Sequence, residues 1–257
     1  MNDLCPSDPE LAPKCVIMIP KPPKLSFISY SFNILFIIAG TLFVVKRLHF
    51  QYQLDHPAVL PSYISNPQYS EQLNIEPAYA RPVNIILLGT SHVYKAHWDE
   101  LLNRSDIGNR GIGSDITAGY LHRLQFVVNS HPRICFIEGG GNDIEMHIPV
   151  DTIVSNLGKV LDTLRNAHII PILQAEFYVG ANYPASVVIN GRLLKLNQQL
   201  SLLAADRNIE YLDLNQLIAP QQVLLPQYCQ PDNIHLNARA YLCWKDAIEK
   251  VLKTHNI

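Results

Sequence analysis

The chain has 257 residues, 48% of them hydrophobic, and a formal net charge of −2 at pH 7. This is enough for one large domain with additional segments. The absence of a basic run with interleaved aromatic residues, and of cysteine pairs at zinc-site spacing, argues against nucleic-acid binding. The five cysteines are scattered and cannot all pair within one chain; a bridge between Cys229 and Cys243 stays open.

The first predicted element is an apolar segment, Leu25–Val45, with no charged residue over 21 positions. A helix of that length crosses the roughly 30 Å hydrocarbon core of a bilayer. Basic residues flank it and no small-residue cleavage pattern follows, so we expect an uncleaved signal-anchor that spans the bilayer once. The alternative is a buried core helix, which would stand unusually between a proline-rich leader, residues 1–24, and a second irregular stretch.

The charges around this segment favour a cytoplasmic N-terminus, because Lys14, Lys21 and Lys24 precede it and Lys46 and Arg47 follow it. The rest of the chain would then lie outside the cytoplasm. Residues 46–80 are rich in Pro, Tyr, Gln and Asn without periodicity, which predicts a linker. The folded domain is expected to span residues 81–257.

Within that domain, strand patterns alternate with helix patterns. The first strand is an apolar run that starts at Val83 and ends at Gly89, directly before Thr90 and Ser91. The other predicted strands are 107–112, 133–137, 169–173 and 209–212; the predicted helices are 91–102, 115–129, 150–167, 187–206 and 237–253. Ser114 or Asp115 would cap the second helix and Asn237 the last. This order predicts an α/β fold, a parallel sheet covered by helices on both faces in three layers.

Four polar segments fall at the ends of predicted strands or just before the last helix. They are Gly89–Ser91, Asn109–Asp115, Gly140–Asp143 and Asp232–His235. In open parallel sheets, ligands and chemistry collect at the carboxyl edge. We therefore expect these segments to converge on one site.

The residue types in these segments are those of nucleophilic catalysis. The Ser91 hydroxyl needs a base to become a nucleophile, and His235 is the natural candidate. Asp232 can reach the other imidazole nitrogen and fix its tautomer. Attack on an ester carbonyl creates a negative oxygen that requires hydrogen-bond donors. The backbone N–H of Ser91 and the side-chain amide of Asn142 can supply them.

A third donor would be the backbone N–H of Gly113 or Ser114, near a predicted helix start. Each feature alone has an ordinary structural explanation. A serine at a strand end is usually a helix cap, Asn142 would usually be a turn residue, and the Asp-x-x-His spacing occurs by chance. The glycines at 139–141 form neither a P-loop nor a dinucleotide fingerprint, and Val93 replaces the second glycine of a nucleophile elbow.

Taken together and in this order, the four segments resemble the SGNH (GDSL-type) hydrolase superfamily. The first family block, usually Gly-Asp-Ser, is Gly89-Thr90-Ser91 here, and in the second block Ser114 stands where a glycine usually precedes the aspartate. Gly140–Asp143 matches the third block, Gly-x-Asn-Asp, and Asp232–His235 matches the last, Asp-x-x-His. The resemblance covers residues 83–252 and implies a flavodoxin-like α/β/α sandwich with serine esterase or acyl-transfer activity.

The resulting hypothesis is a membrane-anchored acyl ester hydrolase acting on a small-molecule, carbohydrate or lipid ester. Ser91, Asp232 and His235 would be catalytic, and Ser91, Asn142 and Ser114 (or Gly113) would form the oxyanion hole. This chemistry calls for no metal and no organic cofactor. Two alternatives stay open: an O-acyltransferase that uses the same acyl-serine on a cell-envelope polysaccharide, and a catalytically silent binding domain. The loop 176–185, with Tyr178 and Tyr183, is expected to line the entrance to the site.

Overall fold

The computed structural model describes residues 34, 36–48, 63–79 and 81–257 of the chain. Its contacts divide the chain into two units, one ending at Phe50 and one beginning at Gln51. The predicted leader, residues 1–24, and positions 25–33 and 35 of the predicted membrane span lie outside the described residues.

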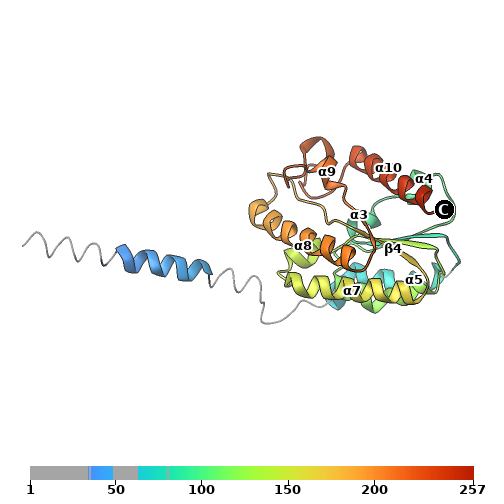
Figure 1. Cartoon of the computed structure of the whole chain (residues 1–257), viewed down its shortest axis with the longest axis horizontal. Coiled ribbons are helices and arrows are strands. Elements are labelled where there is room, and N and C mark those ends of the chain that lie inside the picture. Colours follow the sequence, from blue (N-terminus) through green and yellow to red (C-terminus); the bar gives the residue numbers. More distant parts are fainter. Residues whose placement is uncertain (1–33, 35, 49–62, 80) are drawn as a thin grey trace, which may run out of the picture. The chain divides into compact units, whose positions relative to one another are not determined.

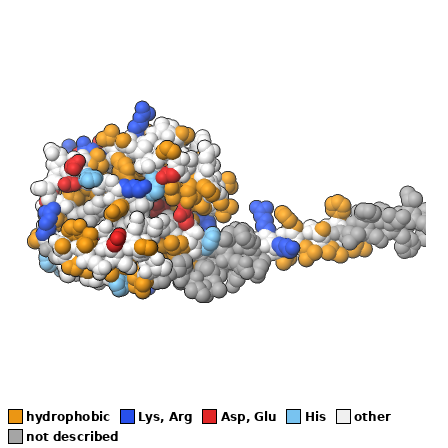
Figure 2. Space-filling view, turned by 180° about the vertical axis from the view of Figure 1, so that it is seen from behind, with side chains coloured by type: hydrophobic (Ala, Val, Ile, Leu, Met, Phe, Trp, Pro, Cys, Tyr) orange, Lys and Arg blue, Asp and Glu red, His pale blue; other side chains and the backbone are white. Residues whose placement is uncertain are grey.

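In the first unit, residues 34 and 36–48 are helical. The large apolar side chains of this helix are exposed, for example Phe36 at 78% and Phe43 at 68%. Figure 2 shows hydrophobic side chains along it and basic ones at one end only. Among the helices that the structure describes, none is both long and apolar enough to cross a membrane.

The second unit is built on five parallel strands, which confirms the predicted α/β class. They are β1 (Ile85–Gly89), β2 (Ile107–Gly111), β3 (Ile134–Ile137), β4 (Ile170–Gln174) and β5 (Glu210–Leu212), in the order β2-β1-β3-β4-β5. This is the flavodoxin-like order, in which the direction of winding reverses between β1 and β3. Every residue of β1 and β3 is buried, as strands covered on both faces require.

Helices cover both faces of this sheet (Figure 1). On one face lie α5 (Thr117–Val128), α7 (Val150–Asn166) and α8 (Ser186–Asp206). On the other lie α3 (Ser91–Tyr94), α4 (Trp98–Leu101) and α10 (Ala238–Thr254), and the chain also forms the short α6 (Gly141–Glu145), α9 (Asn215–Ile218) and η3 (Pro226–Tyr228). Trp98 and Trp244 pack edge to face 4.9 Å apart and join α4 to α10. Cys229 and Cys243 are free, so no bridge joins them.

The predicted single helix from Ser91 to Leu102 is wrong, because α3 and α4 are separate. The Asn109 amide donates to Val93 O and Ala96 O, both at 3.0 Å, and the Trp98 indole N–H donates to Val93 O at 2.9 Å. These side chains therefore bind backbone carbonyl groups where α3 ends and before α4 begins. The helix pattern in the sequence could not reveal partners that come from β2.

A helical segment also precedes the sheet, in the second half of the expected linker. It comprises η1 (Tyr63–Ser65), α2 (Pro67–Ile75) and η2 (Glu76–Tyr79). Tyr69 is buried and donates its hydroxyl to Gly119 O, 50 residues further along the chain. Buried Glu76 forms an ion pair with Arg110 of β2 at 3.1 Å. The folded domain therefore includes residues 63–79, and the boundary expected at residue 81 is wrong because these long-range contacts leave no periodic pattern.

Candidate active site

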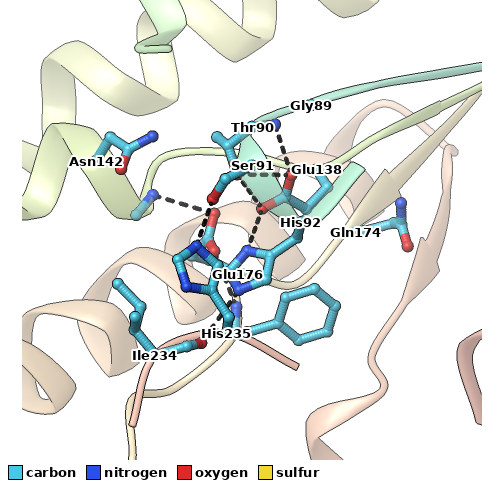
Figure 3. A network of polar contacts seen from close by, with 12 residues as sticks. Gly89, Thr90, Ser91, His92, Glu138, Asn142, Gln174, Glu176, Ile234 and His235 are labelled. Atoms are coloured by element: carbon cyan, nitrogen blue, oxygen red, sulfur yellow. Dashed lines mark hydrogen bonds and ion pairs between the residues drawn. The ribbon is translucent and has the colours of Figure 1, made fainter. Parts of the chain in front are cut away.

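Ser91 is the first residue of α3 and lies two residues beyond Gly89, the carboxyl end of β1. The preceding residue, Thr90, is held by Glu138 from the end of β3: its N–H donates to Glu138 Oε2 at 2.9 Å and its hydroxyl to Oε1 at 3.1 Å (Figure 3). Ser91 thus stands beside the point where the sheet order reverses, which is the usual ligand-binding crevice of such sheets.

The last polar segment of the sequence reaches this serine. Ser91 Oγ lies 3.0 Å from His235 Nε2, and Asp232 Oδ2 lies 2.6 Å from His235 Nδ1. Asp232 Oδ1 accepts the backbone N–H of His235 at 2.9 Å and that of Ile234 at 3.1 Å. Asn233, in the left-handed region at φ 61°, lets the loop turn tightly enough for these bonds. The structure therefore brings together the three side chains that the sequence predicted.

The charges of this group suit proton transfer. Burial raises the pKa of Asp232, but hydrogen bonds from the side chain and backbone of His235 outweigh it and lower the pKa to about 2. Burial lowers the pKa of His235, against the opposing hydrogen bond to Asp232. At neutral pH, Asp232 is therefore ionised and His235 is neutral, with Nδ1–H donating to Asp232 and the Nε2 lone pair facing the Ser91 hydroxyl.

Asn142, the side chain expected to bind the oxyanion, lies in the short helix α6. Gly140, at φ 118°, precedes this helix in a backbone conformation that favours glycine. Asn142 Nδ2 donates to Asp115 O at 2.8 Å. Because an amide carries two N–H groups, one remains for another acceptor.

Gly113 and Ser114 lie in the loop between β2 and α5. Ser114 adopts φ 56°, the left-handed conformation that a glycine takes without strain. Neither backbone N–H makes a hydrogen bond to another group in the described part of the chain. Asp115 fixes the end of this loop, since its buried carboxylate pairs with Arg123 at 2.9 Å. Both N–H groups therefore remain candidate oxyanion donors.

Neither Ser114 nor Asp115 caps α5, contrary to the expectation from the sequence. The helix begins at Thr117, whose N–H and hydroxyl donate to buried Asp143 at 3.0 and 2.6 Å. Burial raises the pKa of Asp143 to about 6. The cap comes from the chain after β3, so the Gly140–Asp143 segment is tied to the loop after β2.

Sequence reasoning missed a buried polar cluster behind the serine, formed by His92, Glu138 and Glu176. His92 Nε2 donates to Ile234 O at 3.2 Å, and its Nδ1 lies 3.5 Å from Glu138 Oε1. Burial, and next the neighbouring Glu138, raise the pKa of Glu176. Glu176 also accepts the Gly141 N–H at 3.0 Å. Polar residues after apolar strands were the only signal that could have indicated it.

The donor atoms of this cluster lie within 4.8 Å of one another, close enough to be considered as metal ligands. However, both carboxylates already accept backbone N–H groups. The cluster therefore fits a structural role, connecting the turn before Ser91 to the turn before Asn142 and to the His235 loop.

A pocket of about 30 Å³ opens beside Ser91. Asn142, His92 and the backbone of Gly141 contribute to its wall, with apolar side chains that include Phe177, Val179, Ile189 and Leu193. Tyr183 from the loop after β4 donates its hydroxyl to Glu145, which also lines the pocket. Tyr178 is instead buried. The pocket can hold only a small group next to the serine.

The doubly wound sheet therefore brings a serine, a histidine and an aspartate into contact at its carboxyl edge, the arrangement that serine hydrolases use. The model of the GDSL-like Lipase/Acylhydrolase family matches residues 81–242. The chain belongs to this family. Comparison with curated protein sequences finds no match.

Solved structures share the fold. A GDSL-like lipase from Bacteroides thetaiotaomicron superposes with a TM-score of 0.64 at 19% identity, covering 73% of this chain and 98% of that one. A lipase/acylhydrolase from Enterococcus faecalis gives 0.57 at 21% identity, covering 67% and 96%. An acetylxylan esterase from Geobacillus stearothermophilus gives 0.56 at 15% identity, covering 66% and 94%. At these identities the likeness concerns the fold alone.

Proposed function

We propose that this chain is a serine esterase that hydrolyses short-chain acyl esters through an acyl-serine intermediate. The observation that carries the proposal is the continuous contact from Ser91 Oγ to His235 Nε2 at 3.0 Å and from His235 Nδ1 to Asp232 Oδ2 at 2.6 Å. A catalytically silent binding domain would not require these three side chains to lie in hydrogen-bond contact.

In the first half-reaction, Ser91 Oγ attacks the ester carbonyl carbon while His235 Nε2 takes the hydroxyl proton. Asp232 stabilises the resulting imidazolium. The carbonyl oxygen becomes negative as the new C–O bond forms, and the ester C–O bond then breaks. His235 gives its proton to the leaving alcohol, and the acyl group remains on Ser91.

In the second half-reaction, a water molecule attacks the acyl carbon and His235 takes its proton. The acid leaves, and the proton returns to Ser91 Oγ. In both halves the oxyanion would be bound by the N–H of Ser91, the free amide N–H of Asn142 and a backbone N–H of the Gly113–Ser114 turn. These donors are preorganised, so they stabilise the transition state without reorientation.

The substrate class follows from the pocket beside Ser91. Its volume of about 30 Å³ is far below the roughly 300–1,000 Å³ of ordinary ligand pockets, which favours a small acyl group over a long acyl chain. The solved structures that share the fold include an acetylxylan esterase, and an acetyl group on a carbohydrate hydroxyl is a substrate of this kind. We therefore expect acetyl esters to be preferred.

The segment 25–45 supports a second part of the proposal, a single membrane anchor with the catalytic domain outside the cytoplasm. Its 21 positions carry no charge, and the apolar side chains of its described part are exposed. Lipid would cover the side chains that the protein leaves exposed.

The decisive experiment is a hydrolysis screen of full-length protein with p-nitrophenyl acetate, butyrate and octanoate and with acetylated sugars, using Ser91→Ala as the control. We expect acetate to be turned over fastest and Ser91→Ala to be inactive. Turnover that survives in Ser91→Ala would refute the acyl-serine mechanism. A preference for octanoate would contradict the short-acyl assignment. Product analysis with an added sugar acceptor identifies acyl transfer, because a transferase would use the same intermediate.

A further inference from the structure

The helical segment before the sheet touches the loop proposed to bind the oxyanion. Asn66 Nδ2 donates to Gly113 O at 2.8 Å across 47 residues of sequence. The same side chain caps α2, since Asn66 Oδ1 accepts the N–H of Gln68 at 3.1 Å. One amide thus links the start of α2 to the peptide bond between Gly113 and Ser114.

This hydrogen bond fixes the direction of a candidate oxyanion donor. The carbonyl of Gly113 and the N–H of Ser114 belong to one planar trans peptide, so they point in opposite directions. With Gly113 O turned toward α2, the Ser114 N–H points away from α2. This N–H has no hydrogen-bond acceptor among the described residues. A hydrogen bond to the carbonyl also polarises the peptide and strengthens its N–H as a donor.

The position of α2 is itself fixed by neighbouring contacts. Tyr69 donates to Gly119 O at 3.2 Å and lies 3.0 Å from His122 Nδ1, both on α5. Gln68 packs so closely on Gly113 that a β-carbon there would lie 1.9 Å from its side-chain oxygen. The turn therefore has little freedom to rotate away from Asn66.

On the opposite side of the loop, Asn142 donates to Asp115 O. Asn66 and Asn142 thus hold successive parts of the same loop, each by a side-chain amide on a backbone carbonyl.

We propose that Asn66 is a positioning residue for the esterase reaction: it holds the Gly113–Ser114 peptide so that the Ser114 N–H faces the developing oxyanion. This inference rests on the function proposed above. It assigns a role in catalysis to a segment that precedes the region matched by the family model, which begins at residue 81.

The test compares wild-type protein with Asn66→Asp and Asn66→Ser. Aspartate and serine are both good helix N-caps, so α2 should keep its start. Neither can donate to Gly113 O: an ionised carboxylate has no hydrogen, and the serine hydroxyl is too short to reach. The matched control is Tyr69→Phe, which removes a contact between α2 and α5 without touching Gly113.

The measurements are kcat and KM for p-nitrophenyl acetate, the rate at which a fluorophosphonate labels Ser91, and the melting temperature. We expect both Asn66 variants to lose kcat by at least roughly tenfold, approaching the 10²–10³-fold loss typical of a missing oxyanion donor, with little change in KM. Labelling should slow in parallel. Tyr69→Phe should melt earlier but keep the wild-type kcat per folded molecule.

Wild-type kcat in both Asn66 variants would overturn the inference, as would a lower melting temperature with unchanged kcat. Equal losses of kcat in Tyr69→Phe would also overturn it, because the effect would then come from displacement of α2. If wild-type protein hydrolyses no ester but Ser91 is labelled, the labelling rates of wild type and the Asn66 variants test the inference in place of kcat. If Ser91 is neither active nor labelled, the proposed function fails, and this inference fails with it.

Discussion

Asp232 holds His235 at both ends, because one carboxylate oxygen lies 2.6 Å from Nδ1 and the other accepts the backbone N–H of the same histidine at 2.9 Å. In Asp232→Asn the side-chain oxygen can still accept the backbone bonds, so the loop should fold. The amide no longer stabilises the imidazolium and favours the wrong tautomer. We expect kcat to fall by about 10⁴, as for the corresponding change in serine proteases, with a near-normal melting temperature. Nearly full activity in this variant would show that the triad assignment is wrong.

The pH dependence should follow His235. Its burial lowers its pKa below the usual 6.5, and only the neutral imidazole can accept the Ser91 proton. Activity should therefore be constant near pH 7 and fall on acidification through an apparent pKa below 6.5. Asp232, with a pKa of about 2, stays ionised throughout this range. A kcat/KM profile between pH 4 and pH 8 measures this fall in activity. A midpoint well above pH 6.5 would contradict a buried, neutral base.

Asn142→Ala should reduce both rate and stability, by separable amounts. Loss of an oxyanion donor should lower kcat by roughly 10²–10³ with little change in KM. Loss of the bond to Asp115 O should cost about 1 kcal/mol of the free energy of unfolding. Asn156→Ala is the control, because it removes a side-chain bond to Thr117 near the same loop but away from the pocket. A destabilised Asn142→Ala with normal kcat per folded molecule would leave Asn142 only a structural role.

Ser114→Gly should stabilise the protein and keep its activity. The left-handed backbone at φ 56° costs a non-glycine residue roughly 1 kcal/mol, which glycine avoids, although the greater freedom of glycine in the unfolded chain offsets part of the gain. The backbone N–H, and not the side chain, is the proposed donor. Chemical denaturation and kcat on the same preparation test this, and a large loss of kcat would indicate that the serine hydroxyl takes part.

The membrane anchor can be tested by fractionation. Full-length protein should sediment with membranes and resist alkaline carbonate, whereas a fragment that starts at Gln51 should stay in solution. The fragment has to begin before Tyr63, because removal of Glu76 would leave buried Arg110 without its ion-pair partner. Release of the full-length chain by carbonate would refute the anchor at residues 25–45.

Much of the sheet could be predicted from the sequence, because a buried parallel strand is visible as a short run of apolar residues. The runs at 85–89, 107–111 and 134–137 are short, bounded by polar or turn residues, and shielded on both faces by helices, so each is readable by itself. The amphipathic helices α7 and α10 were also predictable, because apolar residues recur at helical spacing along one face of each. Ser91 and Asn142 could be named in advance because parallel strands end at one edge and bring the residues that follow them together. Asp232 and His235 were indicated by their Asp-x-x-His spacing just before the last helix.

What only the tertiary structure decided are contacts between residues far apart in sequence. The division of α3 from α4 depends on Asn109, and the start of α5 depends on Asp143 and not on its own neighbours. Residues 63–79 belong to the folded domain because they contact Gly119 and Arg110. No pattern within that segment predicts these partners. Local propensity acts over a few residues, whereas a buried polar group must find its partner wherever the fold places it, and that requirement fixed the limits of this domain.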